Sequence, residues 1–148
     1  MVAIRRAVPA DAAALSELAR SAYAHYVGRI GKEPAPMGED YASRIRVGQV
    51  WVAEQDGVLA GLLVLKIETD HVLLDNIAVS PHAQGTGIGA QLLDFTDKYA
   101  REHGLPEVRL YTNEAMTENL AYYPRHGYTE THRATSNDYR RVYFTKYI

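Results

Sequence analysis

Residues 74–89 read Leu74-Asp75-Asn76-Ile77-Ala78-Val79-Ser80-Pro81-His82-Ala83-Gln84-Gly85-Thr86-Gly87-Ile88-Gly89. A largely apolar stretch ends at Val79, a short loop follows, and alternate glycines precede an amphipathic segment. The N-terminus of a helix leaves backbone N–H groups without partners and carries a partial positive charge. Glycines at its entrance allow an anion to approach those groups closely. The stretch therefore predicts a buried strand that leads into a cradle for a diphosphate.

Hydrophobic periodicity on either side of this stretch predicts a mixed α/β protein. Strands are expected at residues 2–6, 50–52, 58–64, 71–79, 108–112, 128–133 and 140–147, and helices at 9–26, 39–47, 86–102 and 114–124. Residues 28–38 hold three glycines and two prolines, which predicts a loop. Asp56-Gly57 and Ser136-Asn137-Asp138 mark hairpin turns. Because no linker or repeat interrupts the pattern, a single domain over residues 1–148 is expected.

The composition excludes several classes of function. With 47% hydrophobic residues and a formal net charge of -2, the chain has ordinary globular values, and its basic residues form no run that would bind nucleic acid. It has no cysteine, and its six histidines lack the spacing of paired metal ligands, so no metal site is expected. No apolar run reaches membrane-spanning length, which favours a cytoplasmic protein without a membrane partner.

Two classes of cofactor fit a glycine-rich cradle. Gly85-x-Gly87-x-x-Ala90 nominally matches the dinucleotide fingerprint. That fingerprint places its glycines directly at the end of the first strand, whereas five residues intervene here. The next strand ends in Tyr111-Thr112-Asn113, without the acidic residue that binds a ribose. A nicotinamide dinucleotide is therefore the weaker alternative.

Two motifs resemble those of the GNAT superfamily of N-acetyltransferases. Gln84-x-x-Gly87-x-Gly89, preceded by Ile77-Ala78-Val79, resembles its coenzyme A-binding signature. The second motif, similar to the last one of the superfamily, is Asn119-Leu120-Ala121-Tyr122-Tyr123-Pro124-Arg125-His126-Gly127-Tyr128. The resemblance covers nearly the whole chain. It implies the GNAT-type three-layer fold, with a central mixed sheet of about seven strands flanked by about four helices, and acetyl-coenzyme A as co-substrate.

The same resemblance implies roles for individual residues. The backbone of Ile77, Ala78 and Val79 would pair with the pantetheine arm. The diphosphate would lie on the amides of Gln84, Gly85, Thr86, Gly87, Ile88, Gly89 and Ala90. Asn119 would hydrogen-bond the pantetheine arm or cap local structure. Tyr123 is the expected general acid for the departing thiolate. Because Pro124 follows directly, the helix is expected to end or kink there.

The general base is less sharply indicated. Asp75 and Asn76 are neighbours in a strand, so their side chains point to opposite faces. Asp75 is one candidate base and a chain of water molecules is another, whereas His71 and Tyr111 are weaker candidates.

The expected reaction is direct attack on acetyl-coenzyme A, within a ternary complex, by a primary amine of a small molecule or peptide. A non-catalytic acyl-coenzyme A-binding module on the same fold is the alternative. A homodimer through the edge of the strand at 140–147 is a further option.

Overall fold

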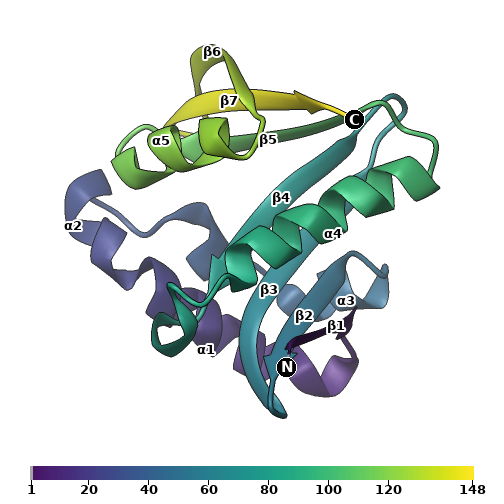
Figure 1. The fold of residues 1–148 in the computed structure, drawn as a ribbon. Helices are drawn as coiled ribbons and strands as arrows, with labels where there is room; N and C mark the ends of the chain where they lie inside the picture. Colours follow the sequence, from purple (N-terminus) through teal and green to yellow (C-terminus); the bar gives the residue numbers. More distant parts are fainter. Residues whose placement is uncertain (1) are drawn as a thin grey trace. The chain divides into compact units, whose positions relative to one another are not determined.

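The computed structural model describes residues 2–148 and contains a seven-stranded sheet of order β1-β2-β3-β4-β5-β7-β6 (Figure 1). The strands are β1 (Val2–Arg6), β2 (Val50–Gln55), β3 (Val58–Ile67), β4 (Val72–Val79), β5 (Glu107–Asn113), β6 (Thr129–Ser136) and β7 (Tyr139–Tyr147). The α-helices are α1 (Ala12–Tyr23), α2 (Val27–Ile30), α3 (Tyr41–Arg46), α4 (Ile88–Glu102) and α5 (Thr117–Arg125). The expected class, a mixed sheet with four helices of more than one turn, is confirmed.

The chain divides into two compact units. The first unit comprises Met1–Leu65 and Asn76–Leu92, and the second comprises Lys66–Asp75 and Leu93–Ile148. The strands β3 and β4 and the helix α4 contribute residues to both units.

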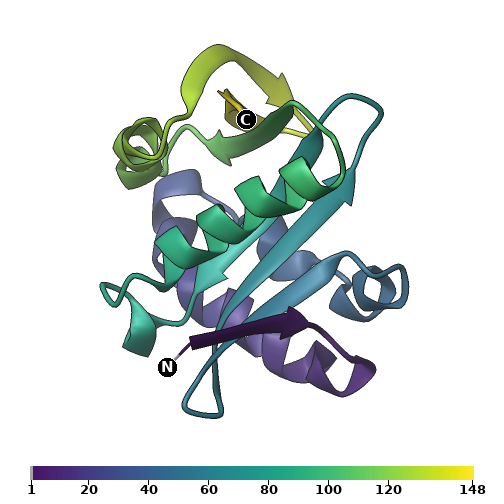
Figure 2. The ribbon, with the colours of Figure 1, turned by 45° about the vertical axis from the view of Figure 1, so that its right-hand side comes forward.

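The first unit has helices on both faces of its strands (Figure 2). On one face, α1 and α3 bury Leu15, Leu18 and Ile45 in a core shared with the strand residues Val50, Val52, Leu62, Val64 and Ala78. On the other face, a Cβ atom at Gly61 would lie 3.2 Å from Leu92 and 3.3 Å from Ile88 of α4. Gly61 therefore lets α4 approach β3 more closely than a side chain would allow.

In the second unit, β5 pairs in parallel with the start of β4 and antiparallel with β7. β7 also pairs with β6, so β7 is an interior strand. The expectation that the strand at 140–147 forms an edge was wrong, and β6 is the edge strand instead. The burial of the two strands agrees with β7 being interior and β6 being at the edge. Val142 and Phe144 of β7 are buried, whereas nearly all of β6 is exposed.

The N-terminal helix differs from the expected 9–26 because its ends are tighter 3₁₀ turns, Pro9–Asp11 and Ala24–Tyr26. The region expected to be a loop holds the single-turn helix α2, which Gly31 ends with a positive φ of 84°. Such a φ suits glycine, which has no Cβ atom to clash with the backbone. Gly31 therefore ends a short helix within the region that was predicted to be a loop.

Two later helices also start after the predicted residue. α4 begins at Ile88 and not at Thr86, because Gly85 and Gly87 have positive φ angles of 81° and 89°. α5 begins at Thr117 because residues 113–116 form a turn, closed by a 2.9 Å hydrogen bond from Met116 N–H to the Asn113 carbonyl. The predicted end at Pro124 is confirmed to within one residue, since α5 stops at Arg125.

Candidate active site

The glycine-rich loop lies in the first unit, between the end of β4 and the start of α4. A 3₁₀ turn at Pro81–Ala83 leads into it, and Gly85 and Gly87 then take left-handed backbone conformations. A Cβ atom added at either glycine would have no atom within 4 Å. The space beside these two residues is therefore open. The first amides of a helix such as α4 have no acceptor within the helix. A loop of this shape can hold an anionic group such as a diphosphate.

Hydrogen bonds within the loop fix its path. The Gln84 side-chain amide donates to the Val79 carbonyl at 3.2 Å, which ties the loop to the end of β4. The Thr86 hydroxyl donates to the Ala83 carbonyl. Ser80 Oγ and His82 Nδ1 lie 2.6 Å apart, close enough to share a hydrogen bond. These side chains thus form hydrogen bonds within the loop and to the strand end that precedes it.

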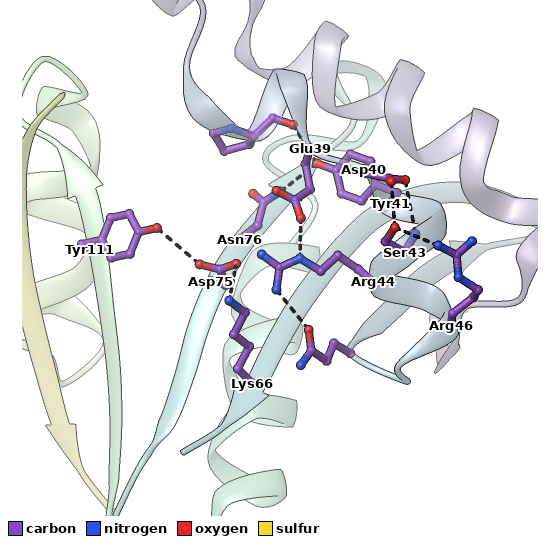
Figure 3. A network of polar contacts seen from close by, with 12 residues as sticks. Glu39, Asp40, Tyr41, Ser43, Arg44, Arg46, Lys66, Asp75, Asn76 and Tyr111 are labelled. Atoms are coloured by element: carbon purple, nitrogen blue, oxygen red, sulfur yellow. Dashed lines mark hydrogen bonds and ion pairs between the residues drawn. The ribbon is translucent and has the colours of Figure 1, made fainter. Parts of the chain in front are cut away.

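The end of β4 is attached to α1 and α3 by a network of hydroxyl and amide groups. The Tyr23 hydroxyl lies 2.8 Å from the Ile77 carbonyl and 2.7 Å from Asn76 Oδ1. Asn76 Nδ2 in turn donates to the Tyr41 hydroxyl at 2.8 Å, and that hydroxyl donates to the Pro36 carbonyl at 3.0 Å (Figure 3). Sequence reasoning did not identify this network, whose polar groups are mostly buried.

Asp75 belongs to the second unit and contacts a different set of residues from its neighbour Asn76. Its carboxylate lies 3.9 Å from Lys66 Nζ and accepts a hydrogen bond from the Tyr111 hydroxyl at 3.3 Å (Figure 3). Burial, together with the Asp75 charge, raises the pKa of Tyr111 above its ordinary value. Tyr111 is therefore a proton donor at neutral pH, which argues against it as the base.

Tyr123 lies on α5 in an aromatic cluster of the second unit. Its ring is 5.7 Å from the rings of Tyr128 and Phe144, and only 6% of the residue is exposed. Its carbonyl accepts hydrogen bonds from the N–H groups of His126 and Tyr128, where Pro124 brings the helix to its end. The neighbouring Tyr122 is less buried, and its ring centroid lies 4.4 Å from that of His126, with the two rings tilted by 44°.

Asn119 also lies on α5, one turn before Tyr123. Its Nδ2 donates to the Thr112 hydroxyl at 3.0 Å, which connects α5 to β5. Within residues 2–148, its Oδ1 accepts no hydrogen bond. The side chain therefore has a structural contact and an acceptor atom that a ligand could use.

The predicted residues fall into two groups. Ile77, Ala78, Val79 and the loop from Gln84 to Ala90 belong to the first unit, and Asp75, Asn119 and Tyr123 to the second. Within the second unit, Asp75 and Tyr123 lie on opposite faces of the sheet. Asp75 contacts Tyr111, whereas Tyr123 contacts Phe144, the strand partner of Leu110. Successive residues of a strand point to opposite faces, which separates the two side chains.

Residues 2–148 contain neither a metal-binding cluster nor a membrane-spanning helix. No group of three or more His, Asp or Glu side chains there is arranged to hold a metal ion. None of the helices in the same range is long and apolar enough to cross a membrane.

Residues 46–130 match the family model of the acetyltransferase (GNAT) domain. This match covers more than half of the chain, which therefore belongs to the GNAT family of acetyltransferases.

A mycothiol acetyltransferase from Thermomonospora curvata is 35% identical over 81 residues, which are 54% of this chain and 27% of that protein. The chain thus matches only about a quarter of that relative.

Solved structures show the same fold. A PaiA N-acetyltransferase from Thermoplasma acidophilum, in complex with coenzyme A, superposes with a TM-score of 0.83 at 20% identity, over 100% of this chain and 99% of that chain. The ribosomal-protein-S18-alanine N-acetyltransferase from Escherichia coli gives 0.79 at 20% identity, over 100% and 94% of the two chains. The strand order, with its antiparallel pairs, is not that of a doubly wound dinucleotide fold.

Proposed function

We propose that the chain is an N-acetyltransferase that moves the acetyl group of acetyl-coenzyme A to a primary amine. The transfer proceeds by direct attack within a ternary complex and is carried out by a single domain over residues 1–148. The observation that carries the proposal is the open loop at Gly85 and Gly87, set between β4 and a 15-residue helix in a chain of the GNAT family.

The residues at this loop fit coenzyme A. The backbone from Gln84 to Ala90 would hold the diphosphate, because a side chain at Gly85 or Gly87 would project into the open space that the anion needs. The backbone of Ile77 to Val79 would donate hydrogen bonds to the pantetheine arm and accept them from it. Asn119 Oδ1 would accept one from an amide N–H of the same arm. When bound, acetyl-coenzyme A would supply an acyl thioester to the amine.

Two side chains of the second unit would move protons. The Tyr123 hydroxyl would donate a proton to the leaving sulfur. Asp75, or a water molecule next to it, would take the proton from the attacking amine.

A second candidate function is a non-catalytic acyl-coenzyme A-binding module on the same fold. The observation that favours it is the burial of Tyr123 in an aromatic cluster, which is also how a purely structural tyrosine would lie. The two functions differ in what the Tyr123 hydroxyl does, and a variant without it separates them.

The proposed acceptor is an amine on a small molecule or a peptide, in the cytoplasm, with no nucleic acid or membrane partner. The name of one structural neighbour, a ribosomal-protein-S18-alanine N-acetyltransferase, supports a nitrogen as the acetyl acceptor. A homodimer is a further proposal, for which β7 offers no free edge because β6 pairs with it.

Thermal unfolding of the purified protein tests the proposal. Acetyl-coenzyme A, coenzyme A, NAD and NADP are added in parallel, each well above a plausible dissociation constant. A ligand at 100 times its dissociation constant stabilises the folded state by about 2.7 kcal/mol, which raises the melting temperature by several degrees. The expected result is a shift with the coenzyme A forms alone. A shift with a nicotinamide cofactor only, or with none of the four, would overturn the proposal.

A further inference from the structure

One face of β5 and β7 carries aromatic and charged side chains in place of a hydrophobic core. Tyr111 pairs with Tyr143 and Asn113 pairs with Arg141 across the two strands, so these four residues share a face. The Tyr111 and Tyr143 rings are 5.7 Å apart. Asp75 lies at the Tyr111 hydroxyl on the same side.

Arg141 is the one buried arginine among the described residues of this unit, in which Arg101 and Arg125 are exposed. Arg133, Arg140 and Arg109 each lie within 4 Å of a carboxylate, on Glu114, Glu130, Glu107 or Asp70. Arg141 is buried, with 9% of its surface exposed, yet no residue in the range 2–148 forms an ion pair or side-chain hydrogen bond with its guanidinium. The guanidinium lies instead over the Tyr111 ring at 4.2 Å and near the Tyr139 ring at 5.7 Å.

A buried guanidinium without an anion is costly unless a ligand supplies one. Its N–H groups form a planar fork that matches the two oxygens of a carboxylate. The Tyr111 ring holds one face of this fork, whose N–H groups point outward in its plane. One unpaired arginine balances one negative charge, which favours a carboxylate over a doubly charged phosphate.

We infer that the acceptor amine carries a carboxylate and that Arg141 binds it, so that the substrate class is amino acids. This inference rests on the proposed function, because it names the acceptor of the same reaction. Tyr111 links the two charges: its hydroxyl contacts Asp75 and its ring contacts Arg141. An amino acid has an amine that would contact Asp75 and a carboxylate that would contact Arg141. Its amine and its α-carboxylate are no farther apart than the length of a tyrosine side chain, which is what joins Asp75 to Arg141 here.

The experiment compares acceptors that differ only in the carboxylate. Phenylalanine, tyrosine, leucine and lysine are each paired with the amine that lacks the α-carboxylate: 2-phenylethylamine, tyramine, 3-methylbutylamine and cadaverine. Binding of each amine to the protein saturated with coenzyme A is measured by calorimetry, and acetylation by thiol release from acetyl-coenzyme A. In at least one pair the amino acid is expected to bind at least ten-fold more tightly than its partner.

Variants assign this preference to Arg141. Arg141→Gln is expected to remove the preference, and Arg141→Lys, which keeps the charge but not the fork, to retain part of it. Arg140→Gln is the matched control, because it removes the same charge from the adjacent residue, whose side chain is 82% exposed. It is expected to keep the full preference.

The outcomes separate the two proposals. Equal binding within every pair, or a preference that survives in Arg141→Gln, would overturn the inference while leaving acetyl transfer to amines intact. Failure of acetyl-coenzyme A itself to bind would instead overturn the proposed function, and this is measured first and independently of any amine.

Discussion

The Tyr23 hydroxyl contacts the backbone carbonyl of Ile77 at 2.8 Å and Asn76 Oδ1 at 2.7 Å. A residue at the end of α1 therefore fixes the strand residues that directly precede the glycine-rich loop. The Asn76 side chain is saturated on its other side by the Tyr41 hydroxyl at 2.8 Å. The position of β4 thus depends on two tyrosines that lie far from it in the sequence.

Replacing Tyr23 with phenylalanine is expected to destabilise the protein by about 1–2 kcal/mol, because the buried acceptor on Asn76 loses its donor. We also expect weaker binding of acetyl-coenzyme A, since Ile77 would be held less firmly. Chemical denaturation and ligand titration measure the two effects. Tyr147→Phe, at a residue that is 76% exposed, is the control and should change stability by less than about 0.5 kcal/mol. Equal stability of the two variants would contradict the assigned role of the Tyr23 hydroxyl.

Gly87→Ala is expected to abolish coenzyme A binding and to cost about 1–2 kcal/mol of stability, because φ is 89° there. Gly57→Ala is the matched control: Gly57 has a φ of 79° and open space around its Cβ position, but it lies in the hairpin turn between β2 and β3. Both variants should unfold at similarly lowered temperatures, and only Gly87→Ala should lose the shift with coenzyme A. Retained binding in Gly87→Ala would show that the loop does not hold the cofactor.

Tyr123→Phe is expected to lower kcat by roughly 100-fold or more while coenzyme A binding is retained, because a general acid contributes to the chemical step. Steady-state kinetics and calorimetry provide the two readouts. Tyr122→Phe is the control on the neighbouring position and should leave kcat nearly unchanged. An active Tyr123→Phe enzyme would assign the proton to another group, and a wild-type protein that binds but never transfers acetyl would favour the binding-module function.

The Asp11 carboxylate gives a stability effect that depends on pH. Its hydrogen bond with Arg5 holds the pKa of Asp11 below its ordinary value of 3.8. A carboxyl group with a lowered pKa in the folded state stabilises that state above the unfolded pKa and loses this contribution as pH falls through the folded pKa. The stability difference between wild type and Asp11→Asn should therefore be constant above about pH 5 and shrink below about pH 4. Urea denaturation across this range measures it, and a difference independent of pH would contradict the expectation.

Lys146 and Asp97 form an ion pair of 2.6 Å that connects β7 to α4, and Asp97 is 8% exposed in its side chain. Lys146→Met leaves that carboxylate buried without its cation, and we expect the free energy of unfolding to fall by about 2 kcal/mol. This is less than for a fully buried pair, because the lysine is partly exposed. The double variant Asp97→Leu/Lys146→Met should recover much of the loss, because both charges are gone. Denaturation of the two variants measures this, and an equal loss in both would show that packing, not charge, is responsible.

Much of the fold could be predicted because it depends on local signals. The core side of α1 follows from the spacing of Leu15 and Leu18, and both residues are buried. The Asp56-Gly57 turn has two successive positive φ angles, as an Asp-Gly hairpin requires. The loop before α4 was likewise predicted from the alternate glycines, of which Gly85 and Gly87 have positive φ.

What could not be predicted depends on residues that are far apart in the chain. Tyr23 is 53 positions from Asn76, and Tyr41 is 35 positions from it, so neither partner can be inferred from periodicity. Nothing in the local pattern of β7 singles out Arg141, and only the pairing of β5 with β7 brings it over the Tyr111 ring. Such contacts follow from strand pairing, which a local pattern does not determine.

The edge strand β6 has a consequence for how copies of the protein meet in solution. A free strand edge offers unpaired N–H and C=O groups to any neighbouring chain and is a common start of aggregation. β6 carries Glu130, His132 and Arg133, and its pairing with β7 is irregular between Glu130 and His132. Charged side chains and a bulge both hinder the addition of another strand. The protein can therefore expose an eight-residue edge at high concentration without growing into a continuous intermolecular sheet.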